Sequence, residues 1–188
     1  MKPAERMGEN MKNMTLTNIA RACNGRLLYP AENSRKETEH AEAVGVVIDS
    51  RKAGENFIFV ATKGERVDGH RFIPDVFAKG ALGVVCEKEP ESLPGPCIVV
   101  EDSFEALKQI GEFYRQQLPV KVVGITGSVG KTSTKEFVAA VLAMKYKVHK
   151  TLGNYNNEVG VPLTVLSMPE DTEVAVLEMG INHFGEMH

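Results

Sequence analysis

The sequence predicts an α/β protein in two parts: a small mixed α/β domain, then the beginning of a parallel-sheet domain. Three observations predict this fold class. Apolar runs of strand length alternate with segments of helical periodicity along the 188 residues. The pattern changes after Leu118-Pro119, where a continuous β-branched run begins. A glycine-rich turn joins that run to a helical segment, as in a parallel α/β sheet.

The first part begins after a polar segment. Residues 1–13 are charged and polar, so we expect a disordered leader without the apolar core of a signal peptide. Apolar residues at helical spacing start at Leu16, and Gly25 stops that helix. Residues 32–42 are polar and are interpreted as a surface loop. Strands are expected at residues 44–48, 57–61, 82–86 and 97–100, with a short helix ending near Gly80 between the second and third.

A longer helix is predicted after Asp102. Asp102 and Glu105 match a capping box, and the apolar residues that follow recur at helical spacing. The helix ends at Leu118-Pro119, which is the predicted domain boundary. The sequence therefore predicts a first domain of residues 14–118 and a second of residues 119–188.

The second part reads as alternating strands and helices. The run 120–126 is typical of a strand buried on both faces, and a helix is expected from about residue 132 to 144. A weaker strand at 147–150, a helical turn at 162–166 and a buried strand at 174–177 follow. Open parallel sheets bind ligands beyond the carboxyl ends of their strands, where Gly127 and Glu178 fall. Three strands would leave long sheet edges unpaired, so we expect this domain to be truncated.

Composition excludes several classes of protein. A formal net charge of −3 gives no reason to expect a nucleic-acid or anionic-membrane partner. No apolar run approaches the length of a membrane span, so no membrane insertion is expected. The three cysteines are odd in number and none is spaced C-x-x-C, which favours structural thiols in a cytoplasmic protein. We expect a monomer.

The glycine-rich turn carries the strongest chemical signal. Two glycines let successive backbone N–H groups face one anion, and the following helix adds its positive N-terminus. The sequence therefore predicts an ATP site, with Lys131 on the β- and γ-phosphates and Thr132 on Mg²⁺. The match to the general phosphate-loop pattern is imperfect, because Ile125 stands where the first glycine belongs. The alternative is an ordinary strand-to-helix turn with a surface lysine. The expected ATP-binding residues are Gly127, Ser128, Val129, Gly130, Lys131, Thr132 and Ser133.

Three polar features lie further along the chain. Glu178 ends an apolar strand, where its carboxylate could complete a Mg²⁺ site with Thr132; the alternative is a solvated strand end. Asn154 and Asn157 either hydrogen-bond a polar substrate or fill an ordinary turn. His183 is a candidate metal ligand or proton-transfer group, although a lone histidine is more often neither.

Polar clusters also follow two strands of the first part. One is Ile48-Asp-Ser-Arg51, and the other runs from Lys63 to His70. Such residues are usually solvated at the surface. Their concentration at the ends of two neighbouring strands instead suits a polar ligand pocket. The candidate substrate-binding residues here are Ile48, Ser50, Arg51, Lys63, Glu65, Arg66, Val67, Asp68 and His70.

Together these segments resemble the Mur ligase family, in the branch that adds D-alanyl-D-alanine to UDP-N-acetylmuramoyl-tripeptide. The likeness runs from about Met14 to the end of the chain. Its order and spacing make it more specific than any one motif, and the unusual G-x-x-G-K-T loop looks like the usual form in this family. The segments that carry the resemblance are Ile48-Asp-Ser-Arg51, residues 57–70, Gly127-Ser-Val-Gly-Lys-Thr132, residues 153–162 and Leu177-Glu-Met-Gly-Ile-Asn-His183.

The resemblance implies an ATP-dependent carboxylate–amine ligase of peptidoglycan-precursor synthesis that works through an acyl phosphate. It implies a UDP-sugar-binding domain followed by the start of a P-loop parallel-sheet ATPase domain. The UDP-sugar would be held by Ser50, Glu65, Arg66 and their neighbours. Lys131, Glu178 and His183 would be catalytic, and Thr132, Glu178 and His183 would hold Mg²⁺. Asn154 and Asn157 would line the substrate site.

Members of that family continue beyond the segments found here, so we expect no ligase activity from this chain alone. Other functions stay open. The chain could belong to the sister branch that adds the third peptide residue. It could be a non-catalytic nucleotide-binding module, or a structural domain in which the loop binds nothing.

Overall fold

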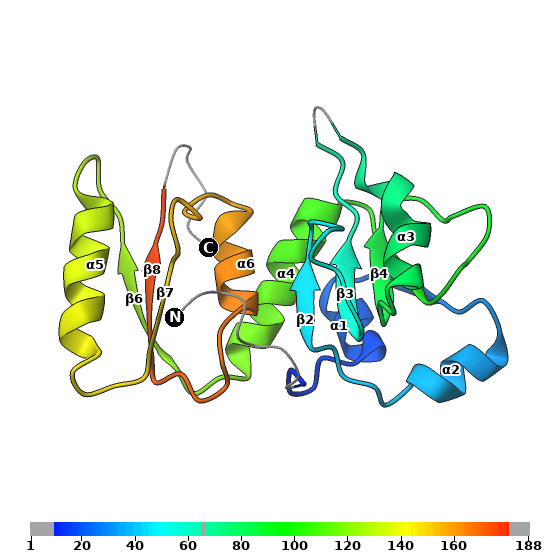
Figure 1. Cartoon of the computed structure of the whole chain (residues 1–188), viewed down its shortest axis with the longest axis horizontal. Coiled ribbons are helices and arrows are strands. Elements are labelled where there is room, and N and C mark those ends of the chain that lie inside the picture. The colour runs from blue at the N-terminus through cyan, green and yellow to red at the C-terminus, as the bar shows by residue number, and fades with distance from the viewer. Residues whose placement is uncertain (1–9, 65–66, 181–188) are drawn as a thin grey trace. The chain divides into compact units, whose positions relative to one another are not determined.

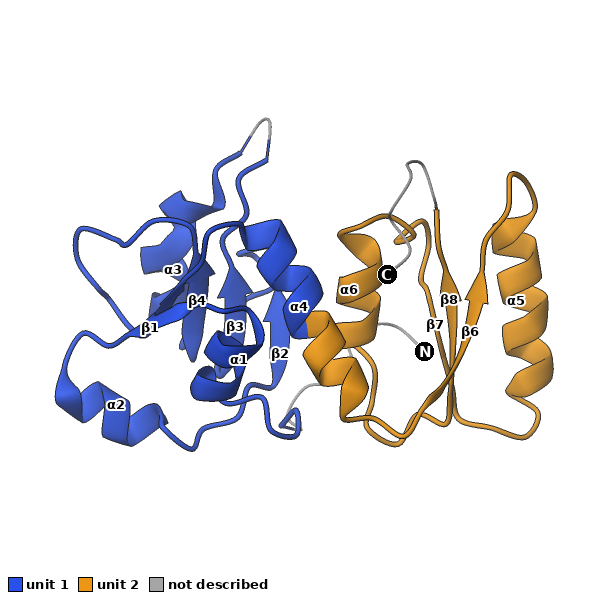
Figure 2. Cartoon of the chain, turned by 180° about the vertical axis from the view of Figure 1, so that it is seen from behind, with its two compact units in different colours: residues 1–110 blue, residues 111–188 orange. Residues whose placement is uncertain are grey.

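The computed structural model describes residues 10–64 and 67–180 (Figure 1). Three predicted site residues, Glu65, Arg66 and His183, lie outside the described residues. The chain divides into two compact units, residues 1–110 and residues 111–188 (Figure 2). The predicted boundary at Leu118-Pro119 falls just after the helix that spans this division. As a boundary between independently folding domains, it stays a prediction.

Unit 1 is built on a five-stranded sheet. Its strands are β1 (Arg26–Leu28), β2 (Gly45–Val47), β3 (Phe57–Val60), β4 (Gly83–Cys86) and β5 (Cys97–Val99). Their order is β1-β5-β4-β3-β2. Strands β2 to β5 are parallel, whereas β1 pairs antiparallel with β5. The carboxyl ends of β2 and β3 are neighbours, so the two polar segments that follow these strands start at the same edge of the sheet.

Helices accompany this sheet, and several of them bury its apolar side chains. They are α1 (Leu16–Ala22), α2 (Glu32–Thr38), the 3₁₀ helix η1 (Gly69–Phe72), α3 (Ile73–Ala78) and α4 (Ser103–Gln116). Ile73 and Val76 of α3 join a core with Phe59 and Val84 of the sheet. The Asp102 carboxylate accepts hydrogen bonds from the backbone N–H groups of the first turn of α4, as the capping pattern predicts.

The predictions for residues 10–13 and 32–42 need correction, and one strand was not predicted. Within the expected disordered leader, Met11 is buried and its backbone N–H donates to the Ala43 carbonyl at 2.7 Å. The predicted surface loop at residues 32–42 contains α2, a helix with no buried residue. Apolar periodicity does not predict such a helix, because polar side chains cover all its faces. The sequence also gives no prediction of the strand β1. It is three residues long and depends on pairing with β5, which lies far along the sequence.

Unit 2 contains a three-stranded parallel sheet. Its elements are β6 (Lys121–Ile125), α5 (Lys131–Leu142), β7 (Val148–Lys150), α6 (Gly160–Leu166) and β8 (Val174–Glu178). The strand order is β6-β8-β7, and α5 and α6 lie on opposite faces of the sheet (Figure 1). All five residues of the central strand β8 are buried. The α/β fold class and the parallel sheet predicted from the sequence are confirmed.

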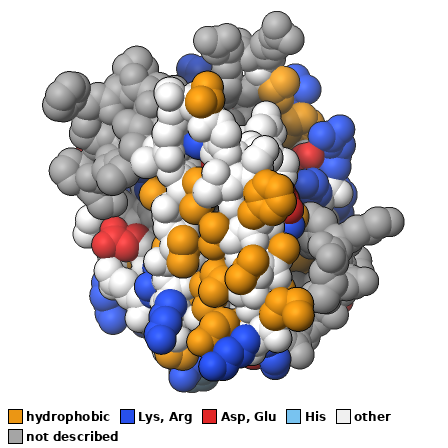
Figure 3. Space-filling view, turned by 90° about the vertical axis from the view of Figure 1, so that its left-hand side faces the viewer, with side chains coloured by type: hydrophobic (Ala, Val, Ile, Leu, Met, Phe, Trp, Pro, Cys, Tyr) orange, Lys and Arg blue, Asp and Glu red, His pale blue; other side chains and the backbone are white. Residues whose placement is uncertain are grey.

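The prediction that residues 120–126 form a strand buried on both faces is wrong. In the described part of the chain β6 has one neighbouring strand, and Val122 is 43% exposed. The outer face of α5 is also apolar and open: Phe137, Val141 and Met144 are 74%, 71% and 88% exposed. Figure 3 shows apolar side chains gathered on the side of the molecule that carries α5. Burial of a strand depends on its neighbours, which β-branched composition does not reveal.

The thiols agree with their predicted structural role. Cys23, Cys86 and Cys97 are all buried, and none forms a disulfide. Cys86 and Cys97 lie in strands and Cys23 directly follows α1, and at such buried positions cysteine behaves as a small hydrophobic residue. Over residues 10–64 and 67–180, no helix combines the length and apolar character that crossing a membrane requires.

Candidate functional site

The glycine-rich loop joins the carboxyl end of β6 to the start of α5, in the predicted strand–loop–helix order. Two of its glycines have positive φ angles, 150° at Gly127 and 76° at Gly130. Gly130 is in the left-handed conformation directly before α5, where a residue with a Cβ is strained. These glycines therefore bend the backbone around one point at the helix N-terminus.

The backbone donors of this loop are available for a ligand. Over the described part of the chain, no protein acceptor is hydrogen-bonded to the N–H groups of residues 128–133. The first backbone bond of the turn runs from Thr134 N to Gly130 O, at 2.9 Å. The Lys131 ammonium donates to the Gly127 carbonyl at 2.7 Å, so it folds back over the loop. The arrangement offers several N–H groups and one cation to an anion.

Glu178 lies at the end of β8, beside the start of α5. Its carboxylate is buried, with 2% of the residue exposed. The Thr132 hydroxyl donates to Glu178 Oε1 at 3.2 Å, and the Asn156 amide donates to the same oxygen at 2.9 Å. The backbone N–H of Glu178 donates to Thr151 Oγ1 at 2.9 Å, which fixes the strand end. Thr132 and Glu178, which the sequence predicts to share a Mg²⁺ site, are therefore in contact, and the metal site itself stays a prediction.

The surroundings of Glu178 keep its carboxylate charged. Burial raises the pKa of this carboxyl group, but the donors Asn156, Thr132 and Lys135 outweigh burial, so the net pKa lies below its ordinary value. Oε2 is buried and has no hydrogen-bond donor among the described residues. The Lys135 ammonium lies 3.3 Å from Oε2 as an ion pair without hydrogen-bond directionality.

The oxygen atoms of this cluster fit a Mg²⁺ ion. A hydroxyl and a carboxylate are ligand types that Mg²⁺ prefers, and within residues 10–64 and 67–180 Glu178 Oε2 accepts no hydrogen bond and has the Lys135 ammonium as its ion-pair partner. No cluster of three or more His, Cys, Asp or Glu in residues 10–64 and 67–180 could hold a metal alone.

Sequence reasoning missed two residues of this cluster, Asn156 and Lys135. The sequence favours Asn154 and Asn157 as substrate contacts, yet it is Asn156 that contacts Glu178. The Asn157 side chain accepts a hydrogen bond from Gly160 N at 2.7 Å, so it shapes the turn before α6. Asn154 is exposed. Substrate binding by Asn154 and Asn157 stays a prediction.

In unit 1, the segment after β2 is organised by an ion pair. The Arg51 guanidinium donates two bonds to the Asp49 carboxylate, at 2.9 and 2.8 Å. This bidentate pair lowers the pKa of Asp49 to about 2. The Arg51 side chain is 87% exposed, so its outer side is open to a ligand. The Ser50 carbonyl accepts a bond from the Lys79 ammonium at 2.7 Å.

The segment after β3 contributes to a cavity. His70 Nδ1 lies 2.7 Å from Asp68 Oδ1, and the Glu87 backbone N–H donates to His70 Nε2 at 2.9 Å. With Nε2 accepting, the proton is assigned to Nδ1, which faces the carboxylate. The cavity has a volume of about 520 Å³, and its wall includes Lys63, Asp68 and His70. Ile48, Ser50, Arg51 and Val67 do not line it.

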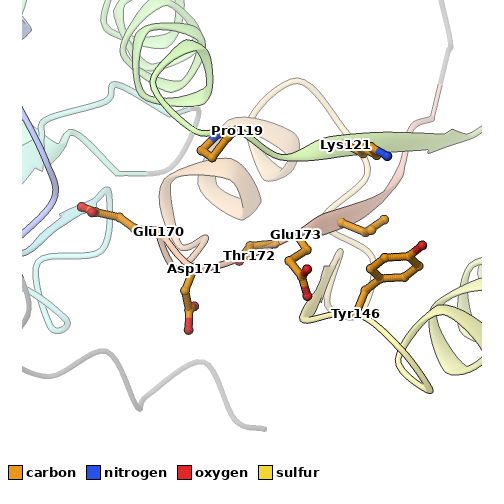
Figure 4. Close-up of a pocket in the computed structure, with 8 residues that line it drawn as sticks. Pro119, Lys121, Tyr146, Glu170, Asp171, Thr172 and Glu173 are labelled. Atoms are coloured by element: carbon orange, nitrogen blue, oxygen red, sulfur yellow. The ribbon is translucent and has the colours of Figure 1, made fainter.

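A second cavity, of about 280 Å³, lies in unit 2 (Figure 4). Lys121, Tyr146 and Glu173 line it, at or just before the starts of the three strands. Open α/β sheets bind their ligands at the opposite edge, beyond the carboxyl ends of the strands. This cavity therefore lies at the sheet edge opposite the glycine-rich loop, and we assign no ligand to it.

Comparison with known proteins gives matches along most of the chain. Residues 42–128 match a family model described as "Mur ligase family, catalytic domain". Residues 125–188 match a second model, "Mur ligase middle domain". A UDP-N-acetylmuramoyl-tripeptide–D-alanyl-D-alanine ligase of Bacillus subtilis is 44% identical over 178 residues, which make up 92% of this chain and 37% of that protein.

Solved structures give the same pattern. The crystal structure of MurF from Acinetobacter baumannii superposes with a TM-score of 0.82 at 32% identity, covering 94% of this chain and 38% of that one. MurF ligase from Thermotoga maritima in complex with ADP gives a TM-score of 0.66 at 38% identity, covering 72% of this chain and 31% of that one. The chain therefore spans well under half the length of each of these relatives.

Proposed function

Because this chain belongs to the Mur ligase family, we propose that it supplies the nucleotide-binding and UDP-sugar-binding parts of an ATP-dependent ligase. The reaction is the addition of D-alanyl-D-alanine to UDP-N-acetylmuramoyl-tripeptide, the activity named for the Bacillus subtilis relative. One observation carries the proposal: the N–H groups of residues 128–133, which have no acceptor in the described part of the chain, lie beside Lys131 and the Thr132–Glu178 pair.

The proposed chemistry balances in two steps. The terminal carboxylate of the tripeptide attacks the γ-phosphorus of ATP, which forms an acyl phosphate and releases ADP. The amine of D-alanyl-D-alanine then attacks the acyl carbon, loses a proton and displaces inorganic phosphate. ATP thus converts a poor leaving group into a good one, and the protein acts by positioning and by neutralising charge.

The glycine-rich loop performs the neutralisation. Its N–H groups and the N-terminus of α5 donate to the phosphates. The Lys131 ammonium, 2.7 Å from the Gly127 carbonyl, exchanges this carbonyl for phosphate oxygens. A structural relative from Thermotoga maritima was solved in complex with ADP, which supports a nucleotide at this loop.

Mg²⁺ belongs to the same proposal. When bound, this ion screens the phosphate charge and makes the γ-phosphorus more electrophilic. Thr132 and Glu178 would hold it, and Asn156 orients the Glu178 carboxylate through its bond to Oε1. His183 stays a candidate ligand and lies outside the described residues.

The UDP-sugar is assigned to unit 1. The exposed guanidinium of Arg51 is preset by Asp49, and a charged donor held in this way suits a phosphate or carboxylate. The cavity of about 520 Å³ beside His70 is large enough for part of a sugar nucleotide. Ser50, Lys63 and Asp68 complete the proposed polar surface.

The test is a calorimetric titration of the 188-residue chain with two ligands. We expect Mg²⁺–ADP and UDP-N-acetylmuramoyl-tripeptide each to bind with one-to-one stoichiometry. Nucleotide binding alone would instead support a nucleotide-binding module. If neither ligand gives a heat of binding, the proposal is contradicted and only a structural role is left for the loop. UDP-N-acetylglucosamine serves as the control that separates recognition of the muramoyl peptide from recognition of UDP.

A further inference from the structure

Lys135 is a buried lysine that the proposed chemistry does not use. It lies one turn into α5 and is 1% exposed. Lysine is almost never fully buried unless it is paired. Its ammonium lies 3.3 Å from Glu178 Oε2, 3.4 Å from the Gly153 carbonyl and 3.5 Å from Glu136 Oε1. The first oxygen belongs to the end of β8, the second to the loop that follows β7, and the third to α5 itself. One cation therefore connects three segments.

Of these partners, Glu178 depends most on Lys135. Glu136 is half exposed, and it is also paired with Lys150. Glu178 is 2% exposed, and among the described residues its ion pair is the one with Lys135. A buried carboxylate without a cation is strongly destabilised, so without Lys135 this side chain is expected to leave its position.

The two oxygens of Glu178 have different partners. Oε1 accepts from Thr132 and Asn156, and Oε2 faces Lys135. The same ammonium donates to the carbonyl of Gly153, a loop residue with a φ of 53°. Lys135 therefore fixes the Glu178 carboxylate and also the start of the loop 153–157, from which Asn156 contacts Glu178.

We propose that Lys135 is a positioning residue for the metal site: it holds Glu178 against Thr132 and ties the Gly153 loop to the same point. This inference rests on the proposed function, because it concerns the carboxylate that holds Mg²⁺ with the nucleotide. Lys135 acts on Mg²⁺-dependent binding through Glu178. Binding of phosphate by the loop amides and Lys131 does not require it.

The test compares nucleotide binding with and without the metal. A fluorescent ADP analogue is titrated into the chain in Mg²⁺ and in EDTA, and the ratio of the two affinities is the readout. In Lys135→Met we expect this ratio to fall by about 10-fold or more, as for other residues that orient metal ligands. The affinity in EDTA stays unchanged. A general loss of structure would lower both affinities together, and Lys135→Arg, which keeps the charge, should recover part of the ratio.

The matched control is Lys150→Met. It removes an ammonium that pairs with Glu136 and leaves Glu178 untouched, so the ratio should equal that of the wild type. An unchanged ratio in folded Lys135→Met would overturn the inference. A wild-type chain that binds no nucleotide would instead overturn the proposed function.

If the Lys135→Met chain does not fold, a second comparison tests the same inference. Glu178→Gln and the double variant Lys135→Met/Glu178→Gln are compared, since neither contains a buried unpaired carboxylate. If Lys135 acts through Glu178, both variants have the same ratio. A further drop in the double variant would show that Lys135 acts by another route and would overturn the inference.

Discussion

Replacing Lys131 by Met separates the role of this side chain in binding from its role in folding. Its ammonium donates a hydrogen bond to the Gly127 carbonyl at 2.7 Å, on an exposed loop. Water replaces that donor, so the free energy of unfolding should change by less than about 0.5 kcal/mol. The bond to Gly127 must break before Lys131 reaches a phosphate, which offsets part of what the phosphate contact contributes.

The size of the binding effect follows from these two contacts. A hydrogen bond between charged groups contributes about 1.5–3 kcal/mol, whereas the exposed bond to the Gly127 carbonyl, which water replaces, contributes less than about 0.5 kcal/mol. The difference, about 1–3 kcal/mol, corresponds to a loss of about 5- to 150-fold in affinity for ADP. Fluorescence titration with a labelled ADP measures this loss, and urea unfolding measures stability.

The matched control is Lys145→Met, which removes the same charge from an exposed residue beyond the end of α5. Its ammonium lies 5.6 Å from the centre of the Tyr146 ring and contacts no part of the loop. Affinity should be unchanged in this variant. Equal losses in both variants would show that net charge is responsible, and no loss in Lys131→Met would refute the assigned contact.

Three further predictions concern the loop, the metal and acid stability. Gly130 has a φ of 76°, and among the described residues no atom outside its chain neighbours lies within 4 Å of the position that a Cβ would occupy. Gly130→Ala should therefore lower the free energy of unfolding by about 1–2 kcal/mol through backbone strain alone, and Gly130→Asn should lower it less. Urea unfolding checks this, and equal stability of the two variants would count against the left-handed loop. Thr132→Val should abolish the gain in ADP affinity on adding Mg²⁺ while leaving affinity in EDTA unchanged; a retained gain in calorimetry would remove Thr132 from the metal site. Arg51 lowers the pKa of Asp49 to about 2. The ion pair therefore adds to the free energy of unfolding above the ordinary carboxyl pKa, and this stabilisation is lost as the pH falls through about 2. Asp49→Asn should lower stability at pH 7 by at most about 1 kcal/mol after solvent screening, and the difference should vanish near pH 2 in urea unfolding.

Local signals in the sequence predict most of the elements that position the site. The β-branched run before Gly127 and the helical spacing after Gly130 indicate a loop between a strand and a helix. The apolar run that ends at Glu178 indicates a carboxylate at the same edge of the sheet. Parallel pairing of β6 with β8 then brings Thr132 and Glu178 together, with Ile125 paired to Glu178 in the register.

The residues that sequence reasoning missed depend on contacts remote in sequence. Lys135 reads as an ordinary charged position on a helix, and its burial arises only because β8 and the Gly153 loop cover it. Asn156 is the same residue type as Asn154 and Asn157, and only the course of the loop places it beside Glu178. The exposure of Val122 likewise depends on which strands pair with β6.

The proposed function depends most on the loop amides, and amide NMR tests them directly. The ¹⁵N-labelled chain is titrated with ADP while the backbone N–H signals of residues 128–133 are followed. We predict that these signals move downfield together and saturate, since their N–H groups have no protein acceptor in the described chain. Unmoved loop signals, or shifts concentrated instead at residues 170–174 around the opposite cavity, would contradict the assignment.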